Sequence, residues 1–148
     1  MLNFSVAANI AVHSLVYLAG LGRVEMVSAN HIAEKLQVSP SHLSKVLQEL
    51  ARRGLVRSTR GARGGFSLAG DPQMVTVLDV ILAVDPPPEP EGCLLGQKIC
   101  RGMECRLQNL RHKVTRLVEE ELSTTTLADF AAVTGFNSSP DEARRASG

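Results

Sequence analysis

The amino-acid sequence predicts a mainly α-helical protein with a small β-hairpin wing: a winged helix-turn-helix followed by a long C-terminal dimerisation helix. Three observations predict this class. Apolar residues recur at helical spacing along most of the chain. Only five of the 148 residues are aromatic, so the core has to be built from Leu, Val, Ile and Ala. An Arg- and Gly-rich turn separates two short apolar segments, which is typical of a hairpin.

These patterns divide the chain into four parts. We expect a winged helix-turn-helix domain over residues 1–85, a linker and cysteine loop over residues 86–106, and a dimerisation helix with a short final helix over residues 104–133. The linker contains four prolines in the run PPPEP and cannot be helical, so we expect a stiff extended segment. Residues 134–148 are rich in Ser, Gly and charge and are expected to be disordered.

The first helix is expected over residues 5–21, where Leu15 and Leu18 lie on one apolar face. Ser28 is a suitable N-cap for a second helix, which turns Ile32 inward. A short turn then leads into a third helix. Two helices joined by such a turn form the helix-turn-helix arrangement.

The third helix has distinct start and stop signals. Ser39 is a favoured N-cap residue, Pro40 suits the first helical position, and Gly54 ends the helix. One face is apolar and is formed by Leu43, Val46, Leu47 and Leu50. The residues expected to bind DNA bases or phosphates lie at the start, on the polar face and at the end of this helix, and they are Ser39, Ser41, His42, Ser44, Lys45, Gln48, Arg52 and Arg53.

A hairpin is predicted directly after this helix, with strands that begin near Leu55 and return through Phe66. Its turn contains Arg57, Arg60 and Arg63 among glycines. A stable hairpin does not need three arginines, whereas a hairpin that contacts phosphates or enters a narrow minor groove does. Taken alone, the same turn is also compatible with a solvated hairpin of no function.

Three further helices are expected. Thr76 and Asp79 have the spacing of a capping box and begin a helix that ends at Asp85. A long helix over residues 104–122 carries an apolar stripe of Leu107, Leu110, Val114 and Leu117. We expect this stripe to pair with its copy in a homodimer, although it could instead fold back on its own domain. Residues 126–132 predict a short amphipathic helix.

Charge is distributed unevenly, although the net charge is only +1. Residues 28–67 contain seven lysines and arginines against two glutamates, a net charge of +5. Residues 68–97 contain five acidic residues and no basic one, a net charge of −5. Positive charge is therefore concentrated in the predicted helix-turn-helix and wing, where contact with DNA is expected.

Three cysteines, Cys93, Cys100 and Cys105, lie within thirteen residues and are accompanied by three glycines. Thiolates bind iron and zinc, and a glycine-rich loop allows several to converge. The spacing does not match a zinc ribbon, a thioredoxin-like site or a ferredoxin, and an odd number argues against a disulfide framework. Spacing alone therefore leaves open a metal or cluster site and three incidental cysteines.

The sequence from about Leu2 to Val133 resembles the IscR/NsrR family of bacterial winged-helix regulators. The resemblance is found in IAVHSLVYLA at residues 10–19, in the segment from His31 to Ala69, and in VTVLDVILAVD at residues 75–85. In family members with three cysteines in this loop, the cysteines hold an iron–sulfur cluster. The resemblance implies a [2Fe–2S] or [4Fe–4S] cluster bound by Cys93, Cys100 and Cys105.

The fourth ligand departs from the family pattern. Relatives similar to IscR have a histidine three residues after the last cysteine, whereas this chain has Gln108, a poor iron ligand. Other relatives use a residue of the first helix of the partner subunit, which corresponds here to Asn9 or His13. His13 is the plausible one of these two, although it could instead be a polar residue on a partly exposed helix face. Glu104 and His112 are further candidates.

The leading hypothesis is a homodimeric transcription regulator that binds a double-stranded DNA operator under control of an iron–sulfur cluster. One rival is a regulator whose cysteines bind zinc or sense thiol oxidation, and another is a protein-interaction adaptor. An enzyme is not expected, because no nucleophile with its base, phosphate-binding loop or carboxylate pair is present. The N-terminal segment has neither a signal peptide pattern nor the length of a membrane span, so a cytoplasmic protein is expected.

Overall fold

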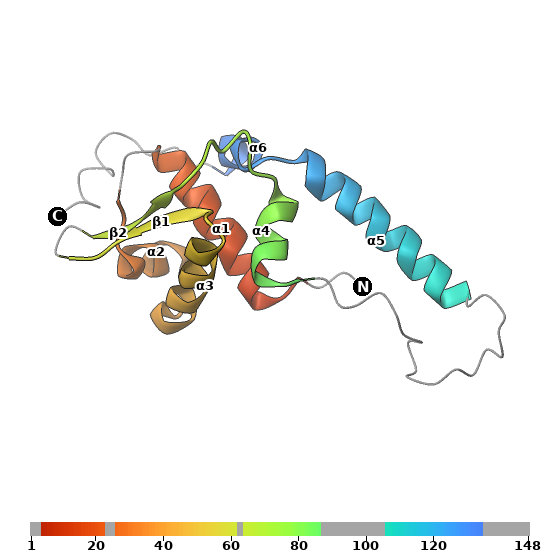
Figure 1. Ribbon diagram of the computed structural model, residues 1–148, viewed down its shortest axis with the longest axis horizontal. Helices are drawn as coiled ribbons and strands as arrows, with labels where there is room; N and C mark the ends of the chain where they lie inside the picture. The colour runs from red at the N-terminus through yellow and green to blue at the C-terminus, as the bar shows by residue number, and fades with distance from the viewer. Residues whose placement is uncertain (1–3, 23–25, 62–63, 87–105, 135–148) are drawn as a thin grey trace.

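The computed structural model describes residues 4–22, 26–61, 64–86 and 106–134. Along this part of the chain the order of elements is three helices, a two-stranded hairpin and three further helices. The hairpin is antiparallel, and most of the described residues are helical, as the sequence predicts. Figure 1 shows α1, α2, α3, α4, α6 and the hairpin gathered in one body, from which the long helix α5 extends.

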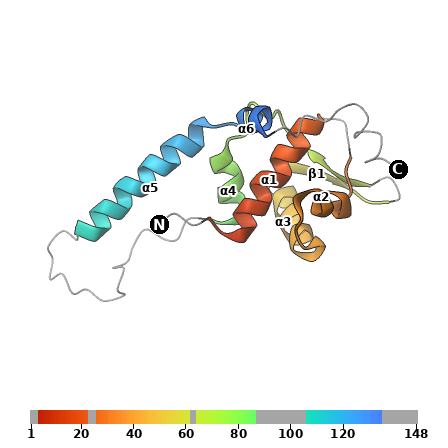
Figure 2. The same cartoon turned by 180° about the vertical axis from the view of Figure 1, so that it is seen from behind.

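Helix α1 (Val6–Leu21) forms the centre of the core and packs against α6, α4, α3, α2 and β2. Its apolar character on most sides follows from this position. Leu15, Val16 and Leu18 are almost completely buried, and so is Ser14, whose hydroxyl donates to the carbonyl of Ile10 at 2.7 Å. Figures 1 and 2 show α1 lying between the α2–α3 pair and the α4–α6 pair.

Helices α2 (Ala29–Leu36) and α3 (Pro40–Arg52) form the predicted helix-turn-helix. The Ser28 hydroxyl caps α2 by accepting from the backbone N–H of His31 at 3.2 Å. The turn between the helices passes through Gln37, which has a left-handed φ of 54°. The predicted apolar face of α3 is buried in full and consists of Leu43, Val46, Leu47 and Leu50.

The N-cap of α3 differs in one respect from the prediction. Ser39 has the extended backbone of an N-cap residue, with φ −61° and ψ 126°, but its side chain makes no capping hydrogen bond. Its hydroxyl instead pairs with that of Ser41 at 2.9 Å. The start of α3 therefore depends on Pro40 and on burial of the apolar face, while both hydroxyls stay exposed at the helix end.

The hairpin consists of β1 (Val56–Thr59) and β2 (Gly65–Leu68), and Ser58 is paired with Phe66. A third segment, which sequence analysis did not predict, extends this sheet. Val27 donates to the Phe66 carbonyl at 2.9 Å and accepts from the Phe66 N–H at 2.8 Å. Strand β2 therefore lies between β1 and Val27, and this bridge attaches the hairpin to the chain that enters α2.

Helices α4 (Val77–Val84) and α6 (Leu127–Val133) begin side by side. Thr76 and Thr126 form an isolated antiparallel bridge, in which Val77 donates to the Thr125 carbonyl and Leu127 to the Val75 carbonyl, both at 2.9 Å. Both helices begin with a complete Thr–Asp capping box, and the one at Thr76 was predicted. At Thr126, hydrogen bonds from the threonine hydroxyl and backbone lower the pKa of Asp129.

Helix α5 (Arg106–Thr124) buries none of its residues. The predicted apolar stripe is solvent-exposed, with Leu110 58% and Leu117 60% exposed. Only its C-terminal end reaches the body, where Leu122 packs against the core and the helix contacts α4. Residues 87–105 of the expected linker and cysteine loop lie outside the described residues, as does the expected tail after Thr134.

Gly65 offers a test of the sheet extension. A Cβ at this position would lie 2.5 Å from the Val27 carbonyl oxygen and 2.7 Å from the carbonyl carbon. Strand β2 would therefore have to move away from Val27. We expect Gly65→Ala to lower the free energy of unfolding by about 1–3 kcal/mol, measured by urea denaturation.

Gly70→Ala is the matched control, because its Cβ would meet only a Val75 methyl at 3.8 Å. Equal stabilities of the two variants would contradict the assigned role of the Val27–Phe66 bridge.

Candidate nucleic-acid interface

The outer face of α3 is the first part of the candidate interface. Ser41, His42, Lys45 and Gln48 are exposed there, and Ser44 is half-buried. These side chains can bind base edges and phosphates, because they offer hydroxyl, imidazole, ammonium and amide groups. The apolar face of the same helix is packed on α1, so the polar face is held rigidly outward.

The end of α3 carries two arginines that share one carboxylate. Arg52 forms an ion pair with Glu49, and Arg53 Nε lies 3.4 Å from the second oxygen of the same carboxylate. The arginine side chains are 76% and 57% exposed, whereas Glu49 is 26% exposed. Such surface pairs contribute little to stability and exchange readily with other anions, including phosphates. Glu49 was not among the predicted site residues, although its spacing of three and four residues from the arginines was a usable signal.

The three hairpin arginines differ in their surroundings. Arg57 donates to the Leu68 carbonyl across the hairpin at 3.4 Å, so it also supports the pairing of β1 with β2. Arg60 is exposed beyond the end of β1, next to Gly61, whose φ of 112° is a conformation that glycine tolerates. Arg63 lies outside the described residues.

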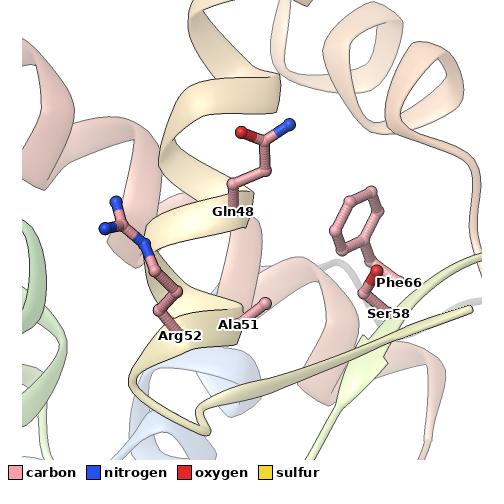
Figure 3. A pocket seen from close by; sticks show the side chains of 5 residues that line it. All are labelled: Gln48, Ala51, Arg52, Ser58 and Phe66. Atoms are coloured by element: carbon pink, nitrogen blue, oxygen red, sulfur yellow. The ribbon is translucent and has the colours of Figure 1, made fainter.

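An open groove of about 440 Å³ separates α3 from the hairpin. Gln48, Ala51 and Arg52 line it from the helix, and Ser58 and Phe66 line it from the two strands. Figure 3 shows the Phe66 ring and the Ser58 hydroxyl next to each other, opposite the helix. Sequence analysis did not identify Ser58 or Phe66 as site residues. The signal was the alternation along β1, because Ser58 lies on the same face of the strand as the buried Val56.

The candidate cluster ligands are only partly within the described chain. Cys93, Cys100, Cys105 and Glu104 lie outside it. On α5, Gln108 is half-buried and His112 is exposed. Within the described ranges no three His, Cys, Asp or Glu side chains are grouped so that they could hold a metal ion.

His13 is exposed on α1, and its Nδ1–H donates to the Asn9 carbonyl at 2.7 Å. In the neutral ring this bond leaves the lone pair of Nε2 available to a metal. The ring borders a pocket of about 290 Å³ whose apolar walls include Val6 and Leu36. Asn9 shares the pocket, and its amide donates to the Phe4 carbonyl at 3.5 Å. Of the two candidates on α1, His13 has the chemistry of a ligand.

No helix in the described part of the chain combines the length and apolar character that a membrane crossing requires.

The comparisons with known proteins agree with this geometry. Residues 4–133 match the Rrf2 family, described as "Iron-dependent Transcriptional regulator". A protein of Aquifex aeolicus, named as an HTH-type transcriptional regulator, is 34% identical over 130 residues, which cover 86% of this chain and 90% of that protein.

Two solved structures are similar in fold and sequence. CymR, the global cysteine regulator of B. subtilis, superimposes with a TM-score of 0.77 at 29% identity and covers 90% of this chain and 99% of its own. IscR of T. potens gives a TM-score of 0.70 at 31% identity, and the match covers 87% of this chain and 85% of that one.

The family match spans nearly the whole described chain, including α1, the helix-turn-helix, the hairpin and the long helix. The matched proteins are transcriptional regulators and not enzymes, in agreement with the sequence prediction. This chain therefore belongs to the Rrf2 family of DNA-binding transcriptional regulators.

Proposed function

We propose that the chain is a homodimeric regulator whose affinity for a double-stranded DNA operator depends on an iron–sulfur cluster. The observation that carries the DNA-binding part is the groove between α3 and the hairpin, because it places the polar flank of the helix opposite the basic wing. The regulator acts in the cytoplasm, where a bacterial chromosome is accessible.

In this proposal α3 enters the major groove and the hairpin reaches an adjacent minor groove. The residues that read base edges are Ser41, His42, Ser44, Lys45 and Gln48. The residues that bind phosphates are Ser39, Arg52, Arg53 and Arg57. Arg60 and Arg63 at the hairpin turn enter the minor groove.

The dimer is supported by the exposed stripe on α5. Four large apolar side chains along one side of this helix are at least 41% exposed, and they are Leu107, Leu110, Val114 and Leu117. A second copy of α5 would bury this stripe and place two α3 helices for a two-fold operator.

The chemistry of the donor set supports a cluster. Cys93, Cys100 and Cys105 offer three thiolates close together in sequence, and His13 of a partner subunit offers an imidazole whose Nε2 is available. When bound, a [2Fe–2S] or [4Fe–4S] cluster supplies iron that reacts with oxygen or nitric oxide, which suits a sensor. The family description as iron-dependent agrees with this assignment.

Binding of a cluster by the cysteines can affect the DNA-binding surface through α5. This helix begins at the residue after Cys105 and ends at the bridge that joins α4 to α6. The thiols therefore act on the helix that sets the spacing of the two DNA-binding domains. Ligand binding shifts the equilibrium between two such arrangements only by its different affinity for each.

Arg60 provides the test of the wing. We expect Arg60→Gln to weaken binding to duplexes of any sequence and to reduce the slope of log K against log salt by about one unit. Fluorescence anisotropy with a labelled duplex at several salt concentrations measures both quantities. Arg116→Gln on α5 makes the same change of charge away from the groove and serves as the control. Absence of salt-sensitive binding by the unmodified protein would favour a protein-interaction adaptor.

Leu110 provides the test of the dimer. We expect Leu110→Lys to place two like charges in the apolar interface and to yield the monomer mass of about 15.9 kDa in sedimentation equilibrium. Glu119→Lys is the control, because nine residues along a helix place position 119 on the opposite side. A dimer that persists in Leu110→Lys would contradict pairing through this stripe.

His13 provides the test of the cluster. Protein purified and reconstituted without oxygen should be brown, with visible absorption, iron and acid-labile sulfide. We expect His13→Ala to shift the visible absorption spectrum and to lose iron faster in air, whereas His112→Ala should leave both unchanged. An unchanged spectrum in His13→Ala would exclude it as a ligand. A colourless protein that contains zinc or free thiols would contradict the cluster and support the rival hypothesis, a regulator whose cysteines bind zinc or sense thiol oxidation.

A further inference from the structure

We propose that the groove between α3 and the hairpin seats the sugar–phosphate strand that separates the major groove from the minor groove of DNA. Within it, the Ser58 hydroxyl donates a hydrogen bond to a phosphate oxygen. This inference rests on the proposed contact of α3 and the wing with a DNA duplex. It adds a binding residue that carries no charge and that the basic pattern of the sequence does not reveal.

The sheet register fixes where Ser58 points. Both hydrogen-bonding groups of the Phe66 backbone are used by Val27, so Phe66 and Ser58 form a non-hydrogen-bonded pair of the hairpin. Side chains of such pairs approach closely, and Figure 3 shows the hydroxyl beside the aromatic ring. Ser58 also lies on the face of β1 that carries the buried Val56, and that face is turned towards α3.

The lining of the groove matches the chemistry of a nucleic-acid backbone. The Phe66 ring and the Ala51 methyl form an apolar floor for the C–H surface of deoxyribose. Gln48, Arg52 and Ser58 provide hydrogen-bond donors for phosphate oxygens. Arg52 brings positive charge to the rim of the groove, since its side chain is 76% exposed.

The way in which a winged helix binds a duplex also favours a sugar–phosphate strand in this groove. When a helix lies in the major groove and the following hairpin reaches the minor groove, one strand of the duplex has to pass between them. The groove that Ser58 lines lies between these two elements, and its volume of about 440 Å³ is open to solvent. A base-reading role for Ser58 does not follow, because base edges face α3.

A hydroxyl contact and an arginine contact have different signatures in salt. We expect Ser58→Ala to raise the Kd for a duplex about tenfold, the usual effect of losing a hydrogen bond to a charged group. The slope of log K against log salt should stay unchanged, because no counterion is displaced by a neutral side chain. Arg52→Gln should lower both the affinity and the slope.

Thr59→Val is the matched control. Thr59 follows Ser58 in β1, is exposed, and lies on the opposite face of the strand. Valine keeps the branched shape and removes the hydroxyl, so its Kd should equal that of the unmodified protein. Thermal unfolding of each variant confirms that the hairpin is retained.

A phosphate-by-phosphate scan locates the contact. In an operator selected from random duplexes, single phosphates are replaced by neutral methylphosphonates. One such replacement should lower the affinity of the unmodified protein for the duplex. The same replacement should not lower the affinity of Ser58→Ala any further. Equal affinities of Ser58→Ala and Thr59→Val, with salt-sensitive binding intact, would contradict the contact between Ser58 and a phosphate. The proposed function would not be affected by that result. Loss of salt-sensitive binding in the unmodified protein would overturn the proposed function itself.

Discussion

Two backbone hydrogen bonds between residues 75–77 and residues 125–127 hold the architecture together. They join the starts of α4 and α6, although Thr126 lies fifty positions after Thr76 in the sequence. Helix α5 therefore returns the chain to the point where α4 begins. Both helices pack on α1, which also supports α3. A displacement of α5 would consequently be transmitted to α3 through packed helices.

A second backbone bridge fixes the hairpin to the body. Val27 pairs with Phe66 on one side of β2, while β1 pairs on the other side. The hairpin is thus fixed to the chain that enters α2, and α2 packs on α3. This arrangement helps to set the width of the groove between the helix and the hairpin, because the hairpin cannot move away from α2 without breaking its backbone hydrogen bonds to Val27. Arg57 adds to this rigidity by bonding the Leu68 carbonyl.

Local signals in the sequence predicted the helices, the turn between α2 and α3, the hairpin, and the capping box at Thr76. These features depend on residues within a few positions of each other. Neither bridge was predictable, because Val27 and Thr126 carry no local mark of their distant partners. The Ser39 hydroxyl was expected to cap α3 and instead pairs with the Ser41 hydroxyl. Ser58 was overlooked because its role depends on the register of the hairpin and on its position opposite α3.

The distribution of charge suggests how such a protein separates its operator from other DNA. Non-specific affinity grows with the number of phosphates that lysines and arginines neutralise. Here Glu49 remains beside Arg52 and Arg53, and its half-buried position keeps it within reach of both. The carboxylate reduces the charge of that flank from two to one and so weakens binding to any sequence equally. In the proposed complex, hydrogen bonds from uncharged side chains such as Gln48 would then contribute a larger share of the affinity. Because those bonds form only in the correct register, they, and not the charge of this flank, would set the ratio of specific to non-specific binding.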